Sequence, residues 1–78
     1  MKYETDNIMY EIVEHIATLE EFSSGWTMEF NIVKWNGGEA KYDIRPWSGD
    51  HKKMGRGITL FEYEMKKVVE AYLERSKK

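Results

Sequence analysis

The sequence predicts a small α+β domain, in which antiparallel strands precede one C-terminal amphipathic helix. Two neighbouring segments, 26–35 and 40–47, alternate between apolar and polar residues, which is the pattern of half-buried strands. Residues 61–73 instead repeat apolar side chains every three to four positions, which is typical of an amphipathic helix. A chain of 78 residues has room for one such domain and one hydrophobic core.

The N-terminal third fits two structures. Residues 1–7 predict a flexible tail. In residues 8–19, IMYEIVEHIATL, the apolar positions recur at helical spacing, and this periodicity favours a helix. The β-branched and aromatic content of the same segment suits a strand. The residues alone leave the choice open.

The next two segments predict a hairpin around the turn residues 36–39, NGGE. Cross-strand partners share a face, so a core that joins Phe30 and Ile32 to Tyr42 and Ile44 requires partner numbers with an even sum and a loop of odd length. The simplest such loop, 37–39 with a bulge, pairs Trp35 with Lys41 and Asn31 with Arg45. The alternation then places basic and aromatic side chains together on the face that the core does not use: Trp35, Lys41, Arg45 and Trp47. The direction of Trp47 stays open, because Pro46 precedes it.

The last third predicts a short strand over 54–60, MGRGITL, and then the helix. Thr59 and Glu62 have the spacing of a capping box at the start of this helix. One side of the helix needs a cover, either the sheet or a second copy of the chain. The side chains expected in that core or dimer contact are Met65, Val68, Val69, Tyr72 and Leu73.

The charge of the chain is unevenly distributed. The net charge is −2, yet residues 1–33 carry −6, residues 34–57 carry +3 and residues 58–78 carry +1. The basic middle segment also contains Trp35, Tyr42 and Trp47. Cations interleaved with aromatic side chains on a sheet suit the binding of a single-stranded nucleic acid, which needs phosphate neutralisation and base stacking.

Several function classes find no support in the residues. The sequence lacks cysteine, which excludes disulfides and thiolate metal sites, and the isolated His15 and His51 predict no metal site. A glycine-rich phosphate loop and a nucleophile elbow are both missing, so we expect neither an enzyme nor a cofactor nor a small-molecule substrate. An apolar signal segment and a run of eighteen apolar residues are also missing, so we expect a cytoplasmic protein without membrane contact, with nucleoid association left open.

The residues KYDIRPW at 41–47, followed by KKMGRGITL at 52–60 and the helix, resemble the C-terminal domain of the transcriptional coactivator positive cofactor four, in particular its small bacterial relatives of the YdbC type. The likeness covers residues 8–75 and is densest at 43–45 and 55–60. It implies a four-stranded, curved antiparallel sheet followed by one helix (ββββα), with 8–19 as the first strand. It also implies a single nucleic-acid-binding domain over 8–76 that forms a homodimer through its helix.

The resemblance implies binding of single-stranded DNA with little sequence specificity, in the regulation of transcription or in DNA maintenance, with RNA left open as a ligand. Arg45, Lys53 and Arg56 match contact positions of the family, and Lys34 and Trp35 lie near others. The alternative is a protein-interaction module with exposed tryptophans. The complete set of expected nucleic-acid contacts is Lys34, Trp35, Lys41, Arg45, Trp47, Lys53 and Arg56.

Overall fold

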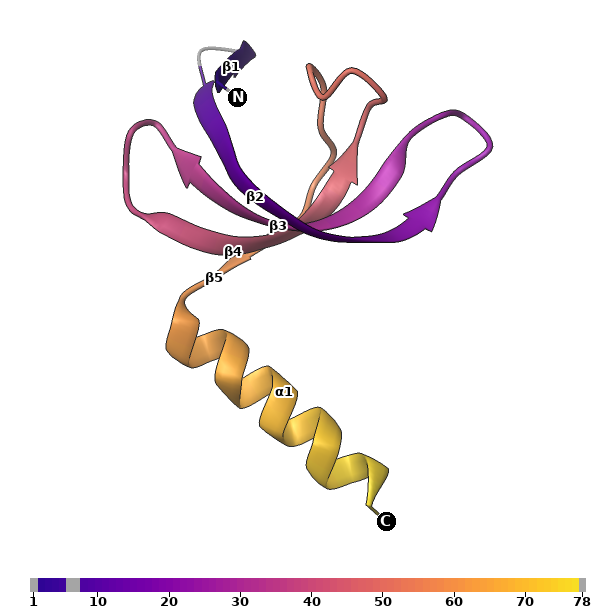
Figure 1. Ribbon diagram of the computed structural model, residues 1–78, viewed down its shortest axis with the longest axis vertical. Coiled ribbons are helices and arrows are strands. Elements are labelled where there is room, and N and C mark those ends of the chain that lie inside the picture. Colours follow the sequence, from indigo (N-terminus) through magenta and orange to yellow (C-terminus); the bar gives the residue numbers. More distant parts are fainter. Residues whose placement is uncertain (1, 6–7, 78) are drawn as a thin grey trace.

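A computed structural model describes residues 8–77 with their side chains, and residues 2–5 by their backbone alone. Within these residues, five antiparallel strands form one sheet in chain order, and one helix follows (Figure 1). The predicted sheet and C-terminal helix are therefore confirmed. The elements are β1 (Lys2–Thr5), β2 (Ile8–Glu21), β3 (Thr27–Trp35), β4 (Ala40–Trp47), β5 (Ile58–Leu60) and α1 (Glu62–Ser76).

Strand β1 lies within the segment for which the sequence predicts a flexible tail. It pairs with the first residues of β2, from Thr5 opposite Ile8 to Lys2 opposite Glu11. The sheet thus has one strand more than the resemblance implies. Residues 1, 6 and 7 of the expected tail lie outside the described residues.

Strand β2 resolves the ambiguity of its segment. The pairing of β2 with β3 shifts register three times, and each shift leaves one extra residue on β2. Such bulges bend and twist a strand, and here they recur every third residue. The apolar side chains therefore follow a period near that of a helix although the segment is a strand, so the helix favoured by the periodicity is wrong. The extra residues are Val13, Ile16 and Leu19.

The hairpin between β3 and β4 has the predicted parity but a different register. Lys34 pairs with Ala40, which leaves the odd loop 35–39 in place of 37–39. Asn36 and Gly37 both adopt positive φ, at 51° and 74°, and this wider turn moves every pair by two positions. The expected pairs of Trp35 with Lys41 and of Asn31 with Arg45 are wrong.

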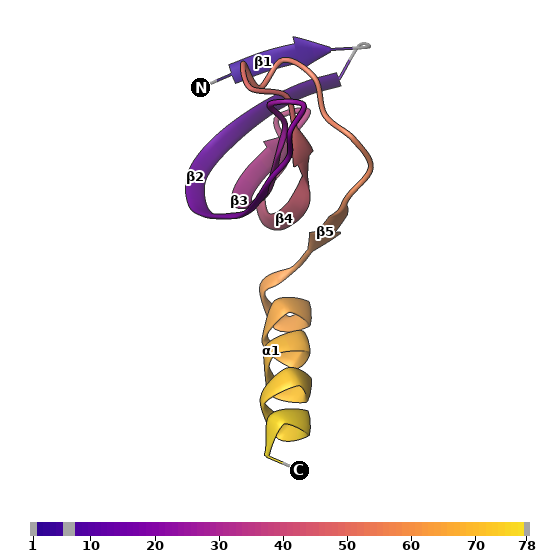
Figure 2. The ribbon, with the colours of Figure 1, turned by 90° about the vertical axis from the view of Figure 1, so that its right-hand side faces the viewer.

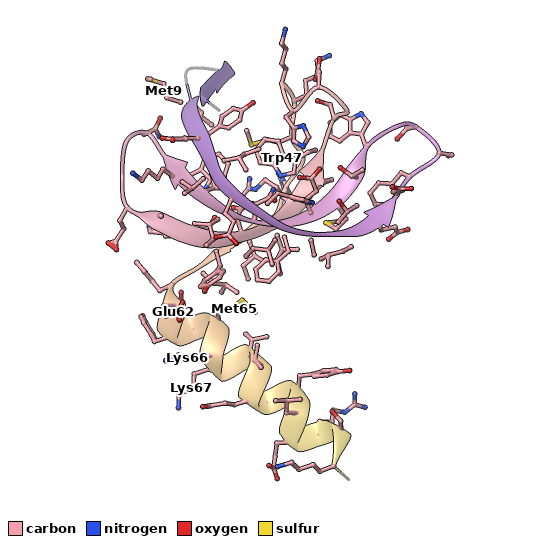
Figure 3. The ribbon with its side chains drawn as sticks, viewed as in Figure 1. Met9, Trp47, Glu62, Met65, Lys66 and Lys67 are labelled. Atoms are coloured by element: carbon pink, nitrogen blue, oxygen red, sulfur yellow. The ribbon has the colours of Figure 1, made fainter. Side chains whose placement is uncertain are left out.

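The core lies on the face for which the sequence predicts a solvent-exposed nucleic-acid surface. This face is concave, and β2 with the loop after β4 curls over it, as Figure 3 shows around Trp47. In the part of the chain whose side chains are described, the buried apolar residues are Tyr10, Val33 and Trp47, with Ile12, Trp35 and Met54 packed against them. The side chains expected in the core lie on the convex face and are only half-buried: Phe30, Ile32, Tyr42 and Ile44.

Helix α1 extends away from the sheet (Figure 2) and buries none of its residues. The Phe61 N–H donates to Glu64 Oε1 over 2.8 Å, so the cap lies two residues beyond the predicted one. Thr59 is not the cap because it lies within β5, where it pairs with Asp43 and its hydroxyl donates to Asp43 Oδ2. Within the described part of the chain, no helix is long and apolar enough to cross a membrane.

Candidate nucleic-acid interface

A groove of about 640 Å³ opens between the loop after β4, the start of β2 and the turn before β3. It brings together three of the predicted cations, Arg45, Lys53 and Arg56, with Trp26. The alternation in the sequence predicts Trp26 on the same side as the apolar core. Trp26 lines the groove instead, because it directly precedes β3 and so lies outside the segment in which side chains alternate. The complete lining is Ile8, Trp26, Arg45, Lys53, Met54, Gly55 and Arg56.

Arg45 forms one wall of the groove and is held by a buried carboxylate. Its Nε donates to Asp43 Oδ1 over 2.6 Å and its Nη2 to Asp43 Oδ2 over 2.8 Å. The guanidinium carbon lies 4.5 Å from the centre of the Trp35 ring, a favourable cation–π geometry. The Arg45 side chain is 14% exposed and that of Asp43 is fully buried. Arg45 and Trp35 thus share a face as predicted, but the charge of Arg45 is largely compensated within the protein.

Trp47, which the sequence predicts as a nucleic-acid contact, does not offer a stacking surface in this conformation. It is 0% exposed. Its ring lies 5.2 Å from that of Tyr10 and is nearly parallel to that of Trp35, at 6.5 Å between ring centres. Alternation carries Trp47 past Pro46 onto the concave face, where the curled sheet covers it. Trp35, by contrast, is only half-buried.

The remaining two predicted lysines lie outside the groove. Lys41 is on the concave face, but its Nζ lies 4.6 Å above the ring of Phe61, at the junction of β5 and α1. Lys34 points to the opposite face from Trp35, because neighbouring residues of a strand alternate. It lines a shallow hollow with Met9 and Glu11. The register and the alternation therefore separate both lysines from the other cations.

The glycines of the Gly-Arg-Gly segment explain how Arg56 reaches the groove. A Cβ at Gly55 would lie 2.6 Å from Cγ of Pro46. A Cβ at Gly57 would overlap with Cβ of Arg45 and the carbonyl oxygen of Ile44. Between the Trp47–Met54 bridge and β5 the chain therefore runs close alongside β4, and this close approach requires residues without side chains.

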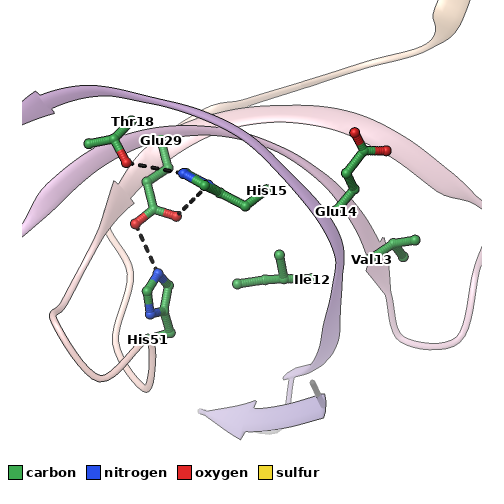
Figure 4. Close-up of a pocket in the computed structure, with 7 residues that line it drawn as sticks. All are labelled: Ile12, Val13, Glu14, His15, Thr18, Glu29 and His51. Carbon is green, nitrogen blue, oxygen red and sulfur yellow. Dashed lines mark hydrogen bonds and ion pairs between the residues drawn. The ribbon is translucent and has the colours of Figure 1, made fainter.

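A second polar cluster lies deeper on the concave face, around the buried carboxylate of Glu29 (Figure 4). His51 Nε2 lies 2.9 Å from Glu29 Oε2, and Asn31 Nδ2 donates to Glu29 Oε1 over 3.1 Å. His15 Nδ1 lies 2.7 Å from Asn31 Oδ1, so this nitrogen carries the proton and donates. Thr27 also donates its hydroxyl to Glu29. The carboxylate thus accepts several hydrogen bonds in place of water.

The sum of these contacts lowers the pKa of Glu29. Burial raises the pKa, but the hydrogen bonds from Thr27, Asn31 and His51, together with the charge of His51, more than offset burial. Within residues 8–77, no three side chains of the histidine, aspartate or glutamate type are arranged to hold a metal ion. The cluster is a buried Glu29 carboxylate that is held by hydrogen bonds from neighbouring side chains.

The lowered pKa predicts acid sensitivity of the fold. The Glu29 carboxyl binds a proton more readily in the unfolded chain, near 4.5, than in the folded protein. Its stabilising contribution is therefore complete above that pH and is lost as the pH falls through the folded-state pKa. Urea denaturation between pH 3 and pH 7 should show a steeper pH dependence for the wild type than for Glu29→Gln. Equal slopes would contradict the prediction.

Known proteins are similar to this chain over most of the residues that form the groove. Residues 22–71 match the family described as Transcriptional Coactivator p15 (PC4). The match runs from the turn before β3 into α1 and so includes most of the groove. Over 60 residues, the chain is 43% identical to an uncharacterized protein of Treponema pallidum (strain Nichols). That alignment covers 77% of this chain and 71% of the relative.

Proposed function

The chain belongs to the transcriptional coactivator p15 (PC4) family, and we propose from this premise that it binds single-stranded DNA with little sequence specificity. The observation that carries the proposal is the groove in which Lys53 and Arg56 face Trp26. Both cations are exposed, and neither makes an ion pair within the described residues. The proposed role is regulation of transcription or DNA maintenance, by binding and without catalysis.

The proposed mechanism separates attraction from selection. Lys53 and Arg56 attract phosphates, which carry no sequence information. The partly exposed ring of Trp26, which lines the groove, offers a π face, and each stacked base contributes about 1–3 kcal/mol. A duplex gains nothing from this ring, because its bases are already stacked. Single strands of any sequence should therefore bind better than duplexes.

Titration of an oligo-thymidine against intrinsic tryptophan fluorescence tests the proposal. We expect quenching that weakens with salt, with a slope of log affinity against log salt of about −0.7 for each phosphate contact. A duplex of equal length should quench far less. Lys53→Gln should flatten the slope by about one contact, whereas Lys67→Gln, on α1 and outside the groove, should not change it. Absence of quenching at low salt would favour the alternative, a protein-interaction module.

We propose further that the protein is a homodimer in which α1 is covered by a second copy. The chain exposes 5848 Å², whereas a compact monomer of this mass exposes about 5,000 Å². Its radius of gyration is 13.7 Å, against about 11.5 Å for a compact domain of this length. The uncovered stripe on the helix includes Val68, Val69, Tyr72 and Leu73, each 44% exposed or more.

Sedimentation equilibrium tests the dimer. At micromolar concentration we expect the mass of two chains, because burying the helix stripe removes apolar area from water. Val69→Asp should shift the mass toward one chain, since a carboxylate in an apolar contact loses its hydration without a partner. The mass of a single chain for the wild type would contradict the proposal.

A further inference from the structure

The loop between β4 and β5 contains a compact unit, residues 48–53. The Ser48 N–H donates to the Lys53 carbonyl over 2.9 Å, and the Lys53 N–H donates back to Ser48 Oγ over 3.0 Å. Inside the unit, the His51 N–H donates to the Ser48 carbonyl over 2.9 Å. Directly below it, Trp47 and Met54 form a β-bridge. The unit is thus closed by its own hydrogen bonds, and the bridge between Trp47 and Met54 keeps its two ends close together.

His51 attaches this unit to the sheet. Its Nε2 lies 2.9 Å from Oε2 of the buried Glu29. Its carbonyl oxygen accepts from the Tyr10 hydroxyl, and its ring lies 5.8 Å from the ring of Trp47. These hydrogen bonds and ring contacts of His51 join residues 48–53 to strands β2, β3 and β4. His51 therefore ties the unit to the sheet through both its side chain and its backbone.

Two features make this closed arrangement unfavourable on its own. His51 has a φ of 60°, a left-handed conformation that is uncommon outside glycine. The indole nitrogens of Trp35 and Trp47 are buried and have no hydrogen-bond partner in the structure. A buried donor without an acceptor destabilises the state that contains it. The cost at the Trp47 indole would be relieved if residues 48–53 moved away from its ring.

We propose that residues 48–53 form a lid over Trp47, that the contact of His51 with Glu29 is its latch, and that opening the lid exposes the Trp47 indole to an unpaired base. The inference rests on the proposed binding of single-stranded DNA. The lid carries Lys53, so the residue that attracts phosphate lies next to the surface that opening uncovers. The indole N–H, unpaired in the closed state, gains a base or phosphate oxygen as acceptor.

The variant His51→Asn tests the lid. Asparagine tolerates the left-handed backbone conformation but is too short to replace the imidazole at Glu29. In the free protein we expect stronger quenching of tryptophan fluorescence by acrylamide, and this increase should disappear when Trp47→Phe is added. Affinity for oligo-thymidine should rise about tenfold, because a hydrogen bond to a charged group no longer holds the closed state.

The matched control is His15→Ala. His15 contacts the same carboxylate from β2, with Nδ1 3.4 Å from Glu29 Oε1, and its hydrogen-bond partners are Asn31 and Thr18, which lie outside the lid. We expect neither stronger quenching nor tighter binding from this variant. Unchanged quenching in His51→Asn, or weaker binding, would overturn the lid. If quenching rises but the wild type fails to bind oligo-thymidine, the lid movement stands and the proposed function, with the role of Trp47 in it, is overturned.

Discussion

The variant Gly57→Ala should lose much of the folding stability of the protein. The added Cβ would overlap with the carbonyl oxygen of Ile44 and with Cβ of Arg45, and both are fixed parts of β4. Strand β5 would have to move off β4, together with the start of α1. Overpacking of this kind costs about 3 kcal/mol at its upper end, which is a large share of the stability of a small domain. Urea denaturation followed by circular dichroism measures the loss.

Gly49→Ala provides the control for a glycine replacement in the same loop region. A Cβ at Gly49 would lie 3.5 Å from the carbonyl oxygen of Gly25, which is an ordinary contact. We expect its denaturation midpoint to stay near that of the wild type. If Gly57→Ala unfolded at the same urea concentration as Gly49→Ala, the close approach of Gly57 to β4 would be wrong.

The second large effect is expected from Arg45→Met. The substitution keeps much of the side-chain volume but leaves the carboxylate of Asp43, which is fully buried, without its cation. Removal of one partner from a buried ion pair costs about 3–5 kcal/mol. Thr59 continues to donate one hydrogen bond to Asp43, which does not replace the lost charge. Chemical denaturation should therefore show a marked loss of stability, and Trp35 should lose the cation above its ring.

The comparison with Lys53→Met separates structure from ligand contact. Lys53 is exposed and makes no ion pair within the described residues, so its loss should weaken DNA binding and leave the denaturation midpoint unchanged. The double variant Asp43→Asn/Arg45→Met should recover part of the stability, because the buried negative charge is gone. If Arg45→Met denatured like the wild type and lost affinity to the same extent as Lys53→Met, Arg45 would be a phosphate contact and not a support of the groove.

Local patterns in the sequence were sufficient to predict much of the fold and part of the candidate site. Alternation located β3 and β4, the parity rule required an odd loop between them, and the apolar stripe located α1. The motif around Asp43 and the Gly-Arg-Gly segment indicated the family, and the basic middle segment indicated the cations of the groove. These features depend on neighbours in sequence, on backbone preferences and on charge, all of which can be read without knowledge of the packing.

Other features depended on how the sheet curves. A period of two shows which side chains share a face, but it does not show which face is enclosed. Three bulges in β2 bend the sheet over the side that carries Trp47, so this side became the core and the apolar convex side remained open. The register places Lys41 next to the ring of Phe61, and residues 48–53 lie against Trp47. These outcomes result from contacts between segments far apart in the chain, and so only the folded structure decides them.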